Sequence, residues 1–87
     1  MATTYSVEQL KQILVDVRQA GKDLEQDLGL AYLSDDMAYE TAQLILDDDV
    51  VLNQQLTKQY GIKDTVGWLA DYVSGNGTGA CYKVQIN

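Results

Sequence analysis

The chain has 87 residues and a formal net charge of −7, from 13 acidic and six basic side chains. This length predicts one domain with a single modest core, and no apolar run approaches the roughly 20 residues of a membrane span. With no histidine and one cysteine, the chain lacks the ligands of a zinc site and cannot form an internal disulfide. Composition therefore excludes membrane-spanning, zinc-dependent and disulfide-stapled classes.

The expected location is the cytoplasm. The first residues, Met1 to Tyr5, lack the basic start and the apolar stretch of a signal peptide. The lone cysteine, Cys81, agrees with a reducing compartment.

The first predicted helix begins at Ser6, a capping serine answered three residues later by Gln9. Gly21 interrupts it at a cost of about 1 kcal/mol relative to alanine, but the apolar stripe keeps its phase, so we expect one helix to about Leu28. Gly29 is suited to its C-terminal cap. The apolar stripe consists of Leu10, Ile13, Leu14, Val17, Leu24 and Leu28.

A second helix is predicted to begin at Ser34 and a third after the aspartates that follow Leu46. Negative charge is unfavourable at a helix C-terminus and favourable at an N-terminus, so we expect a break there, with Asp48 or Asp49 as the cap. We expect the third helix to end at Gly61. The expected buried side chains are Met37, Ala38, Thr41, Ala42, Leu44 and Ile45 in the second helix and Leu52, Leu56 and Tyr60 in the third.

A fourth helix is predicted from a cap at Asp64 to the glycines that follow Ser74. Its expected core side chains are Val66, Trp68, Leu69, Tyr72 and Val73. The predicted fold is therefore all-α, a small bundle of about four short helices over residues 1–73.

Residues 74–87 are predicted to form a glycine-rich hinge and an extended tail. Apolar and polar residues alternate from Ala80 to Ile86, which is a strand pattern. The one candidate partner within the chain is Thr3 to Val7, giving a minor two-stranded pairing; otherwise the tail pairs with another molecule or stays free.

The middle of the chain carries an unbroken block of negative charge. Between residues 23 and 57 there is no lysine or arginine, and the block is flanked by Lys22 and Lys58. Its carboxylates are Asp23, Glu25, Asp27, Asp35, Asp36, Glu40, Asp47, Asp48 and Asp49. Such a block favours a basic partner surface or serves only to keep the protein soluble. If the block folds as two antiparallel helices, its charge spacing of about 3 Å is closer to that of single-stranded than of duplex nucleic acid.

No constellation of residues predicts catalysis, a metal or a cofactor. Counted from Asp47, a calcium loop would need glycine and glutamate where Leu52 and Lys58 stand. Cys81 has only Lys83 nearby to activate its thiol, and it follows a glycine-rich hinge. The sequence thus predicts a protein that is not an enzyme.

The segment from Asp27 to Leu33, Asp-Leu-Gly-Leu-Ala-Tyr-Leu, resembles the Asp-Leu-Gly-x-Asp-Ser-Leu motif of acyl carrier proteins, which are also small, acidic four-helix proteins. The segment from Thr65 to Tyr72 is similar to their last helix. Tyr32 stands where that family has the serine that bears phosphopantetheine, so the resemblance implies no carrier function.

Three functions remain open. The leading hypothesis is a non-enzymatic acidic module that docks on a basic partner, such as a nucleic-acid-mimicking inhibitor of the anti-restriction, anti-CRISPR or immunity type, with no direct binding of nucleic acid or membrane. Alternatives are a ribosomal peptide precursor whose helical leader precedes a modified tail with Cys81 and Tyr82, and a structural protein that self-associates through its C-terminal strand. The predicted partner-binding residues are Asp35, Asp36, Glu40, Asp47, Asp48 and Asp49.

Overall fold

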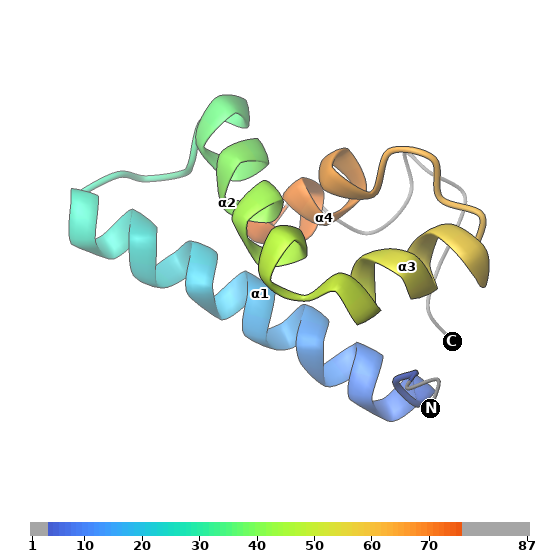
Figure 1. Cartoon of the computed structure of the whole chain (residues 1–87). Coiled ribbons are helices and arrows are strands. Elements are labelled where there is room, and N and C mark those ends of the chain that lie inside the picture. Colours follow the sequence, from blue (N-terminus) through green and yellow to red (C-terminus); the bar gives the residue numbers. More distant parts are fainter. Residues whose placement is uncertain (1–3, 76–87) are drawn as a thin grey trace.

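The computed structural model describes residues 4–75, which form four helices (Figure 1). They are α1 (Val7–Leu28), α2 (Asp35–Asp48), α3 (Val50–Lys58) and α4 (Thr65–Ser74). The predicted all-α fold is confirmed, and residues 4–75 contain no strand. The predicted extended tail lies outside the described residues.

Helix α1 has both of the caps expected from the sequence. The Ser6 hydroxyl accepts from the Gln9 backbone N–H at 3.2 Å, and the Gln9 side chain accepts from the Ser6 N–H at 2.8 Å. Gly29 closes the helix with φ of 68°, a left-handed conformation that glycine adopts without steric cost. Gly21 does not break α1, as predicted.

The boundary between α2 and α3 falls at the predicted aspartates. Helix α2 begins after Ser34, whose hydroxyl accepts from the Met37 N–H, and it ends at Asp48. The Asp49 carboxylate then accepts from the Leu52 N–H at 3.0 Å and so caps α3. Helix α3 ends at Lys58, three residues before Gly61, which has a left-handed φ of 69° in the following turn.

Helix α4 is the centre of the fold. It is capped by Asp64, which accepts from the Gly67 N–H at 3.0 Å. It packs against α1 and α2 and also contacts α3. Trp68, Leu69 and Val73 are completely buried, and the Trp68 and Tyr72 rings lie 4.7 Å apart between centroids. The short α4 is therefore the common packing surface for the longer helices.

Gly21 marks the point where α1 crosses the end of α4. A Cβ atom at this position would overlap the Val73 carbonyl oxygen. In the sequence, Gly21 is only a residue that weakens a helix. In the structure, its lack of a side chain permits the close approach of α1 and α4.

Two of the expected core leucines are exposed. The side chain of Leu28 is 51 % exposed and that of Leu44 is 64 % exposed. The prediction of burial was wrong for both. In α2 the fully buried ridge is Ala38, Ala42 and Leu46, and Leu44 lies about 200° around the helix from Leu46, on nearly the opposite side. The apolar faces of α1 and α2 are wider than the area covered by α4.

The N-terminal segment packs through Tyr5 rather than as a strand. The backbone N–H of Tyr5 donates to the Gln55 side-chain oxygen at 2.7 Å, and the Gln55 amide donates to the Tyr5 carbonyl at 2.8 Å. Val7 already belongs to α1. Both backbone groups of Tyr5 are therefore occupied, and the other half of the predicted strand pair lies outside the described residues.

Among residues 4–75, no helix combines the length and the apolar character needed to cross a membrane.

Candidate protein-binding surface

The carboxylates of the acidic block do not share one surface. Glu25 is buried, with 8 % of its surface exposed, and it pairs with Arg18 at 3.2 Å. Arg18 also donates to the Val73 carbonyl at 2.6 Å, so it binds the last turn of α4 while it neutralises Glu25. Glu25 therefore belongs to the packing of α1 on α4.

Asp49 also has a structural role. Besides capping α3, its carboxylate accepts from the Tyr5 hydroxyl at 2.8 Å. That hydrogen bond, together with burial of the tyrosine and the negative charge of Asp49, raises the pKa of Tyr5 above its ordinary value of 10.0. Asp49 is half-buried, and its predicted part in partner binding stays a prediction.

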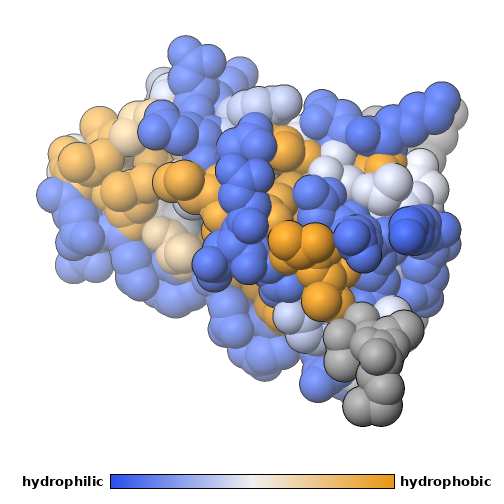
Figure 2. All heavy atoms as spheres, viewed as in Figure 1, coloured by the Kyte–Doolittle hydropathy of each residue, from blue (hydrophilic) through white to orange (hydrophobic). Residues whose placement is uncertain are grey.

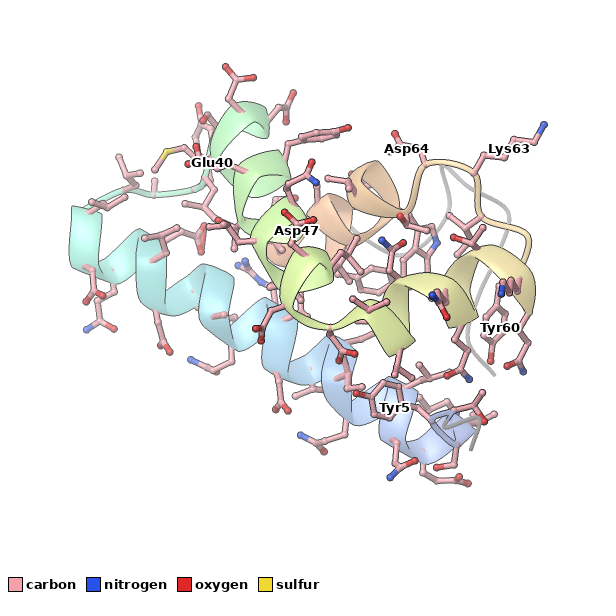
Figure 3. All side chains as sticks on the ribbon, in the orientation of Figure 1. Tyr5, Glu40, Asp47, Tyr60, Lys63 and Asp64 are labelled. Carbon is pink, nitrogen blue, oxygen red and sulfur yellow. The ribbon has the colours of Figure 1, made fainter. Side chains whose placement is uncertain are left out.

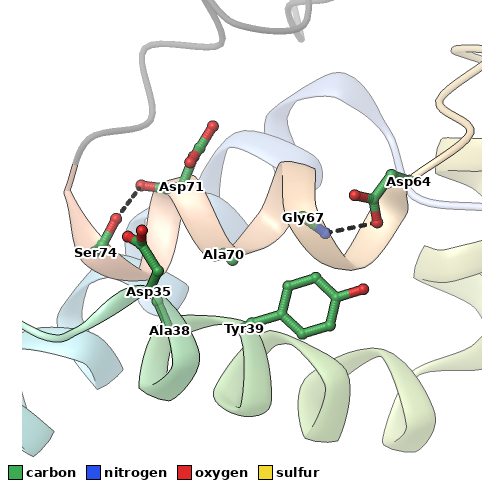
Figure 4. Close-up of a pocket in the computed structure, with 8 residues that line it drawn as sticks. All are labelled: Asp35, Ala38, Tyr39, Asp64, Gly67, Ala70, Asp71 and Ser74. Atoms are coloured by element: carbon green, nitrogen blue, oxygen red, sulfur yellow. Dashed lines mark hydrogen bonds between the residues drawn. The ribbon is translucent and has the colours of Figure 1, made fainter.

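Asp35 lies on the side of α2 that faces α4. There it lines a hollow of about 270 Å³ with Asp64 and Asp71, between the small side chains Ala38 and Ala70 (Figure 4). Within the described part of the chain, no group of three or more acidic, histidine or cysteine side chains is arranged to hold a metal ion. Of the predicted contact residues, Asp35 alone lines this hollow.

Asp36, Glu40 and Asp47 form a row on the outer side of α2. Residues separated by four and by seven positions return to the same side of a helix, with axial spacings of about 6 and 10 Å at 1.5 Å per residue. All three side chains are exposed, and Glu40 and Asp47 lie on the side of α2 that faces away from α4 (Figure 3). We call these three residues the α2 acidic row.

Within residues 4–75, the α2 acidic row has no basic counter-charge. The one ion pair among residues 4–75 is the one between Arg18 and Glu25. The nearest compensation for the row is a hydrogen bond of 3.3 Å from the Gln43 amide to Asp47. Unpaired charges of one sign create an outward negative field that attracts cationic surfaces.

Exposed apolar side chains border the row. Leu44 lies one turn after Glu40, and Asp48 lies one turn after Leu44. Leu28, Leu30 and Tyr32 are exposed as well, at the end of α1 and in the loop that leads to α2. Figure 2 shows hydrophobic atoms gathered over this end of the molecule beside hydrophilic atoms over α2. An apolar centre with a charged rim is typical of protein-binding surfaces.

The structure thus brings together Asp36, Glu40 and Asp47 from the predicted set, leaves Asp48 exposed about 100° around α2 from Asp47, and places Asp35 and Asp49 elsewhere. The predicted tail residues Cys81 and Tyr82 lie outside the described residues. Sequence reasoning missed the exposed Leu44, although its position, two residues before the buried Leu46, places it away from the buried ridge of α2.

No family model, curated protein or solved structure matches this chain.

Proposed function

We propose that this protein is a non-enzymatic, cytoplasmic binding module that docks on a basic surface of another protein through the α2 acidic row. The observation that carries this proposal is that Asp36, Glu40 and Asp47 are exposed on one side of α2 and have no ion-pair partner among residues 4–75. An ordinary solvated helix usually mixes charges of both signs at spacings of three and four residues. A row that keeps one sign is suited to steering a cationic partner.

The narrower form of the proposal is an inhibitor that imitates a nucleic-acid backbone, of the anti-restriction, anti-CRISPR or immunity type. The axial spacings of about 6 and 10 Å correspond to roughly two and three nucleotide steps of 3.4 Å along a single strand. The row would then place carboxylates at three phosphate positions of a basic groove, separated by about two and three nucleotide steps. Glu25, Asp35 and Asp49 take no part in the row, so the imitation is sparser than the sequence alone suggests.

The test begins with capture of partners from an extract of the source organism on immobilised protein. A variant that carries Asp36→Asn, Glu40→Gln and Asp47→Asn should lose the proteins that wild type retains at low salt. The retained proteins should be basic and should elute as the salt concentration rises, because exposed charge pairs are screened.

The matched control changes the net charge equally at another place. Glu8, Asp23 and Asp27 are exposed on α1, and Glu8→Gln, Asp23→Asn and Asp27→Asn together raise the net charge by the same amount. This control should retain the partner. If the two variants lose it equally, overall charge rather than the α2 acidic row accounts for capture, and the proposal fails.

A further inference from the structure

A groove runs between α1 and α2. Two hollows of about 280 and 240 Å³ lie along it. In Figure 1, α1 and α2 diverge from the end of α2 toward the loop that joins them. Both helices pack on α4 and make few contacts with each other, so the space between them is left uncovered. The lining residues are Ile13, Val17, Ala20 and Leu24 from α1 and Met37, Thr41, Leu44 and Ile45 from α2.

The two hollows share no lining residue, but they follow one another along the same face of α1. The lining positions of α1 are separated by four, three and four residues, which is the spacing of a single helix face. The lining positions of α2 follow the same spacing from Met37 to Leu44. From Ile13 to Leu24 the groove is about 16 Å long at 1.5 Å per residue, which is about three turns of a helix.

The walls of the groove are apolar and partly open to water. Leu24, Met37 and Ile45 are half-buried, and Leu44 is 64 % exposed. Beyond Leu24, the exposed Leu28 continues the same face of α1 by one further turn. Exposed apolar side chains that lie side by side offer a surface on which a partner's apolar side chains can pack.

The rim of the groove is acidic. Asp16 lines one hollow and Glu40 lines the other, and no lysine or arginine lines either. Asp48 follows one turn after Leu44 on α2. Lys22 lies about 200° around α1 from both Ala20 and Leu24, since each residue turns the helix by about 100°. The rim therefore complements a cationic ligand.

We propose that the groove between α1 and α2 binds an amphipathic helix with lysine or arginine flanks, supplied by the partner protein. Its apolar side chains enter beside Val17 and Ile45 in one hollow and beside Leu24 and Leu44 in the other, and its cationic side chains pair with Asp16, Glu40 and Asp48. Apolar anchors repeated every three to four residues along about three turns match the lining on both walls. The basic character of the partner rests on the proposed function, whereas the helical occupant rests on the groove itself.

A second copy of this chain fits the groove less well. Each copy carries a net charge of −7, and seating one acidic rim against another brings like charges together, which disfavours association. A cationic helix removes this conflict.

The test uses a defined peptide with isotope-labelled full-length protein. The probe is an 18-residue peptide of leucine and lysine, with leucines placed on one helix face, and its control is a scrambled peptide of the same composition. The ordered peptide should bind at least tenfold more tightly by fluorescence anisotropy. Backbone amide signals of Ala20, Leu24, Thr41 and Leu44 should shift in NMR spectra as it is added.

Two matched variants test the position of the site. Leu44→Ser lies in the groove, and Val15→Ser lies on the other flank of α1; their side chains are 64 % and 61 % exposed in the wild type. Because neither leucine nor valine is buried, both variants should fold. Leu44→Ser should weaken binding of the ordered peptide about tenfold, and Val15→Ser should leave it unchanged.

Equal affinity for ordered and scrambled peptides would overturn the proposal, and so would equal effects of the two serine variants. Tighter peptide binding after deletion of residues 78–87 would show that the chain's own tail occupies the groove. A concentration-dependent dimer displaced by the peptide would identify a second copy as the occupant. Loss of partner capture by the acidic-row variant with unchanged capture by Leu44→Ser would retain the proposed function and reject the groove.

Discussion

The crossing of α1 on α4 and the outer side of α2 use charge in opposite ways. At the crossing, Glu25 is buried and paired with Arg18, which also donates to Val73. On α2, Glu40 and Asp47 are exposed and lack a basic partner within residues 4–75. The carboxylates of both regions belong to one uninterrupted acidic segment of the sequence. Position within a charge block thus does not decide the role of a carboxylate; its burial and its partners do.

We expect the crossing of α1 on α4 to govern stability and the outer side of α2 to govern binding. Substitutions at the crossing should lower the free energy of unfolding. Substitutions on α2 should leave that free energy nearly unchanged while they weaken partner binding.

The largest loss of stability is expected for Gly21→Ala. The added methyl group would overlap the Val73 carbonyl, so α1 and α4 must separate. Overpacking of this kind outweighs the gain of about 1 kcal/mol in helix propensity. We expect a loss of about 3 kcal/mol in the free energy of unfolding, measured by urea denaturation.

Gly29→Ala is the control for this substitution. A Cβ atom at Gly29 would meet nothing within 4 Å, and the only cost is the left-handed φ of 68°, about 1 kcal/mol. Equal losses at Gly21 and Gly29 would contradict the close approach of α1 and α4.

Arg18→Met should lower the free energy of unfolding by about 2 kcal/mol, because it leaves the buried Glu25 without its ion pair and the Val73 carbonyl without this donor. Adding Glu25→Gln should recover part of the loss, since the variant then buries no unpaired charge. Lys22→Met, at an exposed position on the same helix, should change stability by less than about 0.5 kcal/mol. A double-mutant cycle by thermal unfolding would measure the coupling, and independent effects of Arg18 and Glu25 would refute the pairing.

Tyr5→Phe should lower the free energy of unfolding by about 1 kcal/mol at neutral pH, because the hydrogen bond to Asp49 is lost. The folded state raises the pKa of Tyr5 above 10.0, so this contribution is complete below about pH 10 and declines as the pH rises through the folded-state pKa. The stability difference between wild type and Tyr5→Phe should therefore stay constant up to about pH 10 and shrink as the pH rises further. A difference that stays constant would show that the tyrosine proton is not shared with Asp49.

The smallest effect on stability is expected on the outer side of α2. Asp36→Asn, Glu40→Gln and Asp47→Asn together should change the free energy of unfolding by less than about 0.5 kcal/mol, because none of these carboxylates forms an ion pair within residues 4–75. Calorimetry of this variant beside wild type would measure the change. A loss above about 2 kcal/mol would give the α2 acidic row a structural role and remove the contrast between the two regions.

Local signals in the sequence predicted the helices well. Ser6, Ser34, Asp49 and Asp64 cap the helices that follow them, and Gly29 closes α1. Each of these signals acts within about four residues, so it can be recognised without knowledge of the tertiary structure.

The relations between helices could not be predicted in this way. The role of Gly21 depends on where α4 ends beside α1, and the pairing of Arg18 with Glu25 depends on the same contact. The exposure of Leu44 depends on how much of α2 is covered by α4. The sequence therefore identified the acidic segment but could not separate its buried and capping carboxylates from its exposed, unpaired ones.

The most direct test of the central claim is the salt dependence of affinity for the captured partner, compared between wild type and the Asp36→Asn, Glu40→Gln and Asp47→Asn variant. We expect the wild-type affinity to fall steeply with salt, because exposed charge pairs are screened. The variant should bind more weakly at low salt and show a flatter dependence. Identical affinities and identical salt dependence for the two proteins would contradict the claim that the α2 acidic row binds a basic partner.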